Sequence, residues 1–142
     1  MTIYFCHDCV IITKKNLQSL FLDGQLYSAT VADFSGGDPL IYREVQRTEQ
    51  YDLKQLNQPS FVSAVERNGY VFVFFRETAM EFMNCGKAIY SRVARVCKND
   101  KGGPYKFSRK WTSFLKTRLN CSVPGEYPFY FDEIRKKLKF SL

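Results

Sequence analysis

Runs of apolar residues near the middle of the chain predict two β-strands. Residues 70–75 are all aromatic or β-branched, a composition that fits a pleated surface and loses rotamer freedom in a helix. Asn68-Gly69 just before this run predicts a tight hairpin turn, because both residues tolerate positive φ angles. In residues 90–96 two valines each follow an arginine, a pattern typical of a strand with one solvated face. We therefore expect residues 70–97 to form two strands of one sheet.

The upstream half of the chain repeats this pattern. Asp23-Gly24 supplies a second turn between candidate strands at 17–22 and 26–34, and residues 40–45 match residues 88–93. The offsets are 45 residues for the turns and 48 for the matched strands. A period of roughly 40 to 50 residues made of short strands is the signature of β-propeller blades, and a generic β-sandwich is the alternative.

Polar and turn-forming residues predict where the loops between these strands lie. Loops are expected at 35–39, 47–59 and 98–104, which are polar or rich in glycine and proline. Residues 111–119 have the apolar spacing of an amphipathic helix, but the surrounding β pattern favours a strand. Residues 129–131 would open a third repeat.

The length limits what such a repeat can build. The chain has 142 residues, enough for one ordinary domain with a packed core. Repeat units bury their faces against neighbouring units, and about three of them are a minimum for stability. Two blades and part of a third are not expected to close on their own.

Positive charge is concentrated at the C-terminus. The chain has a formal net charge of +7, to which Arg135, Lys136, Lys137 and Lys139 contribute strongly. A surface that binds nucleic acid is expected on the folded body, with aromatic residues between the basic ones. We therefore expect no nucleic-acid partner, although an intracellular nucleic-acid-binding adaptor that uses this basic tail is the alternative function.

Neither end of the chain carries an obvious targeting segment. No stretch approaches the ~20 apolar residues of a membrane span. Residues 1–3 contain no basic residue, and two cysteines, a histidine and an aspartate interrupt the apolar run that follows, so a signal peptide is not indicated. The chain is expected to begin within a longer protein.

No constellation of residues points to an enzyme or a metal site. Cys6 and Cys9 have the spacing of half a zinc site or a redox motif, but His7 is the only histidine and no second such pair exists. A hydrolase needs a nucleophile with a base in reach, and none is evident. We expect no catalysis, no metal and no cofactor. A leader without a specific function, or an artefact, is the preferred interpretation of this segment.

Long blocks of residues resemble the sema domain of the semaphorin family and cover roughly residues 17–134. The matching blocks are 22–28, 32–34, 47–50, 56–59, 74–77, 86–88, 91–100, 102–103, 111–116 and 118–125. Residues 84–87 and 126–131 look most like the transmembrane semaphorins of invertebrates. The resemblance divides the chain into an unmatched leader (1–16), a partial sema domain (17–134) and an unmatched basic tail (135–142). Both unmatched ends look like translated non-coding sequence or expression scars, a hypothesis that junction-spanning transcript reads would refute.

The resemblance implies a fold and a function. It implies an all-β fragment of a seven-bladed β-propeller, with about two blades and the start of a third. Its parent would be an extracellular guidance ligand that forms a sema homodimer and binds plexin receptors as a chemorepellent in axon guidance and cell migration. The parent would be secreted or lie on the outer face of the plasma membrane, anchored only through C-terminal regions beyond this chain.

Covalent sites are expected at four positions, of which the resemblance implies the first two. Cys97 and Cys121 match cysteines that form disulfides with partners further along the family's chain, outside this one. Cys85 lies in a short loop, where we hypothesise an inter-subunit disulfide, with a buried or free thiol as the alternative. Asn120 opens a glycosylation sequon. Receptor contacts are expected in polar loops between strands, without a choice among those loops.

Overall fold

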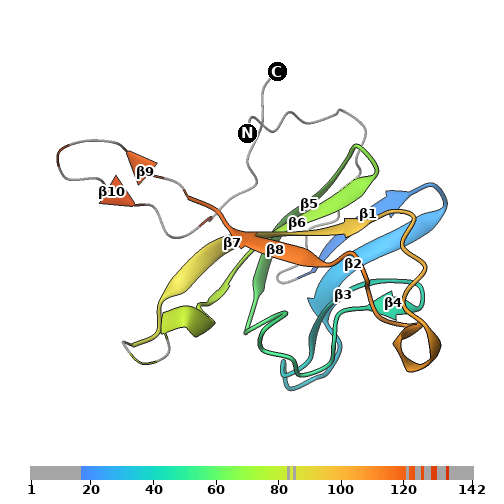
Figure 1. The fold of residues 1–142 in the computed structure, drawn as a ribbon. Coiled ribbons are helices and arrows are strands. Elements are labelled where there is room, and N and C mark those ends of the chain that lie inside the picture. Colours follow the sequence, from blue (N-terminus) through green and yellow to red (C-terminus); the bar gives the residue numbers. More distant parts are fainter. Residues whose placement is uncertain are drawn as a thin grey trace.

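The computed structural model describes residues 17–82, 84, 86–120, 122–123, 126, 129–130 and 134. These residues form two four-stranded antiparallel sheets, a two-stranded ribbon and two single-turn 3-10 helices (Figure 1). Within this part of the chain, no helix is long and apolar enough to cross a membrane.

The first sheet is an up-and-down meander in the order β1-β2-β3-β4. Its strands are β1 (Gln18–Leu22), β2 (Gln25–Val31), β3 (Pro39–Arg43) and β4 (Gln46–Arg47). Asp23 and Gly24 form the first turn with φ angles of 49° and 79°, as the sequence predicted.

The second sheet repeats this meander in the order β5-β6-β7-β8. Its strands are β5 (Ser60–Arg67), β6 (Tyr70–Thr78), β7 (Ile89–Cys97) and β8 (Leu115–Arg118). Asn68 and Gly69 turn with φ angles of 52° and 79°, close to those of the first sheet. The predicted internal repeat is therefore confirmed, and each repeat is one four-stranded sheet.

Some predicted boundaries were wrong. The region 47–59 was expected to be a loop, but its first residue completes β4, a strand that is too short to show any alternation. In 111–119 only β8 is a strand, and Trp111 lies before it in an irregular segment. Phe129–Tyr130 does form a strand, β10, which pairs with β9 (Ser122–Val123) in the two-stranded ribbon.

The first strands of the two sheets, β1 and β5, contact each other, and the core lies between the sheets (Figure 1). Leu20 and Ile41 face it from the first sheet, and Val71 and Phe75 face it from the second. The rings of Phe61 and Phe75 lie 5.8 Å apart within it. Phe61 and Phe75 pair across β5 and β6 of the second sheet, and burying a side chain of this size contributes about 1.5 to 3 kcal/mol.

A buried arginine connects the sheets at their outer part. Arg43 of β3 is 5% exposed, and its guanidinium carbon lies 5.5 Å from the Tyr27 ring centre and 5.1 Å from that of Trp111. Its NH groups donate to the backbone carbonyls of Lys98 and Asp100, which follow β7. Among the described residues, no carboxylate pairs with Arg43.

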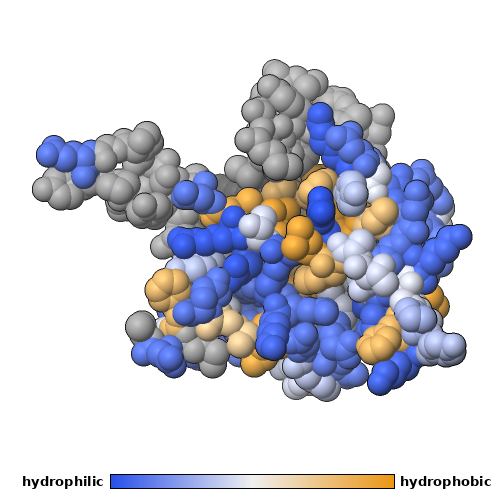
Figure 2. All heavy atoms as spheres, viewed as in Figure 1, coloured by the Kyte–Doolittle hydropathy of each residue, from blue (hydrophilic) through white to orange (hydrophobic). Residues whose placement is uncertain are grey.

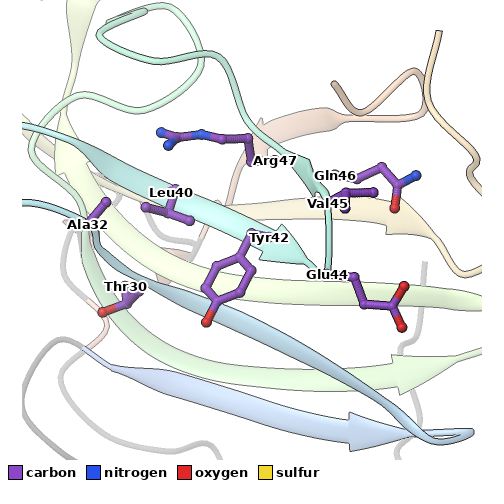
Figure 3. A pocket seen from close by; sticks show the side chains of 8 residues that line it. All are labelled: Thr30, Ala32, Leu40, Tyr42, Glu44, Val45, Gln46 and Arg47. Carbon is purple, nitrogen blue, oxygen red and sulfur yellow. The ribbon is translucent and has the colours of Figure 1, made fainter. Parts of the chain in front are cut away.

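The other face of the first sheet is open. Phe21 and Leu26 pair across β1 and β2 on this face, and both are exposed. Beside them is a hollow of about 350 Å³, into which the side chains of Leu40 and Tyr42 point (Figure 3). An apolar sheet face of this kind needs a cover, and in a propeller the neighbouring blade supplies it.

Candidate functional site: loops at one end of the sheets

Three connections lie at one end of the sheets, because antiparallel strands place alternate turns at opposite ends. They are residues 32–38 between β2 and β3, 48–59 between β4 and β5, and the part of the β6–β7 connection that includes 79–82. Asn57 and Thr78 join the last two by a hydrogen bond of 3.1 Å from the Thr78 N–H to the Asn57 carbonyl. We call this surface, at the lower left and bottom of Figure 1, the aromatic end.

Large apolar side chains project from the aromatic end into solvent. Phe34 is fully exposed, Tyr51 is 65% exposed, and Leu53 and Phe82 are also exposed. Aromatic side chains are enriched among the residues that dominate protein–protein binding, because each buries a large area at a small entropic cost. These three loops are therefore the best candidates for a protein-binding surface.

The loop that presents Phe34 is held in one conformation by Asp33. The Asp33 carboxylate accepts hydrogen bonds from the Ser35 hydroxyl, from the Gly37 N–H at 3.0 Å and from the Asp38 N–H at 2.8 Å. These bonds, that of Ser35 first, lower the pKa of Asp33 below its usual value. Phe34 is thus displayed from an ordered turn, which reduces the entropy lost on binding.

A shallow cavity of about 240 Å³ lies between two of these loops. Its lining combines apolar, amide and acidic residues: Gly36, Gly37, Pro39, Glu49, Tyr51, Asp52, Leu53, Leu56, Asn57 and Gln58. Tyr51 and Gln58 both adopt left-handed backbone conformations, with φ angles of 55° and 50°. Such conformations are uncommon for residues other than glycine and often occur near functional sites.

A buried ionic cluster fixes the other two loops. Glu77 of β6 is 2% exposed, and it accepts a hydrogen bond of 2.9 Å from the Asn57 N–H. Its other oxygen lies 2.6 Å from Arg92 Nε and also contacts the Lys116 ammonium. Arg92 reaches on to Glu81, at 2.6 Å. The buried carboxylate of Glu77 therefore positions Asn57, next to Leu56, directly. Through Arg92 it also positions Glu81, next to Phe82.

Asp100, in the connection that leads from β7 to β8, is the most heavily hydrogen-bonded carboxylate described. It accepts bonds from the Gly102 N–H, from the N–H and hydroxyl of Thr112, and from the N–H and hydroxyl of Ser113, at 2.5 to 2.9 Å. Burial alone would raise the pKa of Asp100, but these donors outweigh burial and lower it from 3.8 to about 2. The aspartate therefore closes the loop between Gly102 and Ser113.

The structure places two of the covalent sites predicted from the sequence. Cys97 ends β7, is half-buried and makes no disulfide with any described residue. Asn120 follows β8 and is exposed. Cys85 and Cys121 lie outside the described residues, as do Cys6, Cys9 and the two segments 1–16 and 135–142. No group of three metal-ligating side chains occurs among the described residues.

Sequence reasoning identified the loops as a class but missed the individual residues that stand out on them. Phe34 and Tyr51 are aromatic residues in loops that are otherwise polar, and this contrast was the available signal. Their exposure depends on the turn of Asp33 and on the backbone of Tyr51, which no pattern in the chain reveals.

Comparison with known proteins extends these observations. No family model matches the chain. It is 68% identical over 127 residues to Semaphorin-1A of Tribolium confusum, a match that covers 89% of this chain and 18% of that protein. Human Semaphorin-6D is 53% identical over 133 residues, which cover 89% of this chain and 12% of that protein. The insect relative is the more similar, in line with the invertebrate character of the sequence.

Solved structures agree in sequence and fold. The extracellular domains of Drosophila Semaphorin 1b share 77% identity with this chain at a TM-score of 0.82, covering 85% of this chain and 24% of that one. Another structure holds Semaphorin 1b in complex with Drosophila Plexin A. The two sheets are thus part of a β-propeller. The chain belongs to the semaphorin family and carries part of a sema domain. It spans less than a fifth of the length of its curated relatives.

The depressed pKa of Asp100 predicts loss of stability in acid. Because the folded pKa is about 2 and the usual value is 3.8, the stabilisation is complete above about pH 4 and is lost as the pH falls toward 2. It amounts to about 2 kcal/mol. Unfolding of the full-length protein followed between pH 5 and pH 2 should show a shallower decline for Asp100→Asn than for the parent. Glu44→Gln, which changes an exposed carboxylate, is the control. Equal slopes for parent and Asp100→Asn would contradict the assignment.

Proposed function

We propose that the full-length protein is a semaphorin-type extracellular ligand whose sema domain binds a plexin receptor. The observation that carries the proposal is the 77% identity to Semaphorin 1b, a protein that has been solved with Plexin A. The relatives are semaphorins, which argues against the nucleic-acid-binding alternative. The protein would act in cell migration and axon guidance, as a chemorepellent.

The placement outside the cell follows the same reasoning. Semaphorin 1a and Semaphorin 1b are both described by their extracellular domains. The protein would be secreted or displayed on the cell surface, and any membrane anchor would lie in regions beyond this chain. We propose a non-enzymatic role for the same reason, since the relatives are semaphorins.

The aromatic end is the surface that we assign to the receptor. It combines exposed Phe34, Tyr51 and Leu53 with loops that are ordered by Asp33 and Glu77. Ordered aromatic anchors surrounded by polar groups are the usual centre of a protein interface. The neighbouring cavity of about 240 Å³ offers space for a side chain of the partner.

Substitutions at the aromatic end should weaken receptor binding. Phe34→Ser and Tyr51→Ser in the full-length protein should each raise the Kd for plexin at least about 10-fold, which corresponds to about 1.4 kcal/mol. Tyr105→Ser is the control, because Tyr105 is also a largely exposed aromatic residue but lies in the β7–β8 connection. Surface plasmon resonance with immobilised plexin measures all three. Unchanged affinity in both test variants would remove the aromatic end from the receptor interface.

We also propose covalent roles for three cysteines and for the glycosylation sequon. We infer that Cys85 links two subunits of a sema homodimer, since its neighbours Asn84 and Gly86 are both exposed. Cys97 and Cys121 would pair with cysteines beyond this chain, and each closed loop would contribute on the order of 4 kcal/mol in the chain-entropy model. Asn120 is exposed, as a glycosylated asparagine must be.

One peptide map tests these covalent assignments. Proteolysis of the secreted full-length protein without reduction should release a Cys85–Cys85 cross-linked peptide, together with separate disulfides from Cys97 and Cys121. Enzymatic deglycosylation should convert Asn120 to aspartate. A free thiol at Cys85, or a covalent dimer that survives Cys85→Ser, would contradict the inter-subunit bond. A Cys97–Cys121 disulfide would contradict pairing beyond the chain.

A further inference from the structure

Charge is distributed unevenly among the loops. The three connections of the aromatic end, 32–38, 48–59 and 79–88, hold five acidic residues and two lysines. The segment 98–110, which we call the basic loop, holds five basic residues and one acidic residue. That acidic residue is Asp100, whose carboxylate is buried and turned toward Thr112 and Ser113. Within the loop itself, basic residues therefore outnumber acidic ones five to one.

Three of its cations make no ion pair with any carboxylate that the structure describes. Lys98 pairs with Asp23 at 2.5 Å, and Lys110 pairs with Glu49 at 2.9 Å. The other three, Lys101, Lys106 and Arg109, are exposed and make no ion pair within the part of the chain that the structure describes. A cluster of unpaired surface cations attracts polyanions, because binding releases the counterions that the polyanion holds.

The backbone of the basic loop is ordered. Its 3-10 helix η2 (Tyr105–Phe107) is closed by a hydrogen bond of 2.9 Å from the Gly103 N–H to the Phe107 carbonyl. Gly102 has a φ angle of 81°, and a Cβ at this position would lie only 2.0 Å from the Ser108 carbonyl oxygen. The compact turn therefore requires glycine. The three cations are carried on a preformed support rather than on a mobile tail, which lowers the entropic cost of binding.

The basic loop lies at the outer edge of the first sheet. It runs along β4, the last strand of that sheet, through a hydrogen bond of 2.8 Å from the Arg47 N–H to the Arg109 carbonyl. Figure 1 shows η2 beyond β4, far from the contact between β1 and β5. At the lower right of Figure 2, in the same region, hydrophilic side chains lie beside hydrophobic ones. Blades in a propeller pack face to face, so this edge stays open.

We propose that the basic loop binds a sulfated polysaccharide of the cell surface or extracellular matrix, through Lys101, Lys106 and Arg109. A flexible chain that carries a sulfate on most of its sugar units can neutralise three neighbouring cations without a shaped pocket. Clusters of lysine and arginine are a recognised feature of heparin-binding surfaces. The proposal rests on the extracellular placement in the proposed function, but it needs no contact with plexin.

Immobilised heparin provides the test. All variants are made in a full-length protein whose basic tail residues are changed to serine, so that the tail cannot bind heparin. These residues are Arg135, Lys136, Lys137 and Lys139. The loop variant carries Lys101→Ser and Lys106→Ser. The matched control carries Lys54→Ser and Lys87→Ser, which are two exposed lysines outside the basic loop and give the same change in charge. Thermal unfolding of each protein checks that the fold is retained.

The loop variant should bind heparin about 25-fold more weakly at physiological salt, since each of the two lysines near an anionic surface contributes about 5-fold. The slope of log affinity against log salt should also fall in that variant, while the control changes less than about 2-fold. Equal losses in the two variants, or no loss in either, would overturn the proposal. A loop variant that keeps its heparin affinity but loses plexin binding would also overturn the proposal, because the basic loop would then contact the receptor. If the full-length protein binds heparin through the basic loop but does not bind plexin, the receptor proposal fails and the polysaccharide proposal stands.

Discussion

A buried guanidinium that pairs with no described carboxylate joins the two sheets at their outer part. Removing Arg43 from water is costly, and the cost is offset only because two aromatic rings and two backbone carbonyls surround the cation. Trp111 closes the other side of the same junction, where its indole N–H donates to the Ile41 carbonyl at 2.8 Å. Neither sheet contains this environment alone, since Arg43, Tyr27 and Gln46 come from the first sheet, whereas Lys98, Asp100 and Trp111 follow β7 of the second. The junction forms only when the sheets are paired.

The interaction surfaces depend on that junction. The Lys98 and Asp100 carbonyls point at Arg43, so the Asp100 carboxylate turns toward Thr112 and Ser113 and closes the basic loop. At the aromatic end, Glu77 performs the corresponding task by joining the Asn57 backbone to Arg92. Buried polar groups of this kind fix one geometry because every alternative leaves charges unpaired. Loops from two different blades can therefore act as one surface.

The sequence revealed the repeat because turn chemistry and strand composition are local. Asp23-Gly24 and Asn68-Gly69 specify their hairpins, and the apolar residues of 70–75 specify β6 whatever the rest of the chain does. What could not be predicted depends on distant partners. Arg43 looks like a surface residue at the end of a strand, and its burial follows from carbonyls 55 and 57 residues away. The exposure of Phe34 likewise depends on the turn that Asp33 caps, and resemblance to a family names neither residue.

A double-mutant cycle between Arg43 and Trp111 tests most directly whether one junction joins the sheets. Arg43→Met and Trp111→Phe leave an apolar side chain at each position while they remove the cation and the indole N–H. Urea unfolding of the full-length protein gives the stability of each single and double variant. A shared junction predicts that the two losses are not additive, with a coupling energy of about 1 to 3 kcal/mol. Losses that add to within about 0.5 kcal/mol would show that the two residues act independently, and would contradict the account.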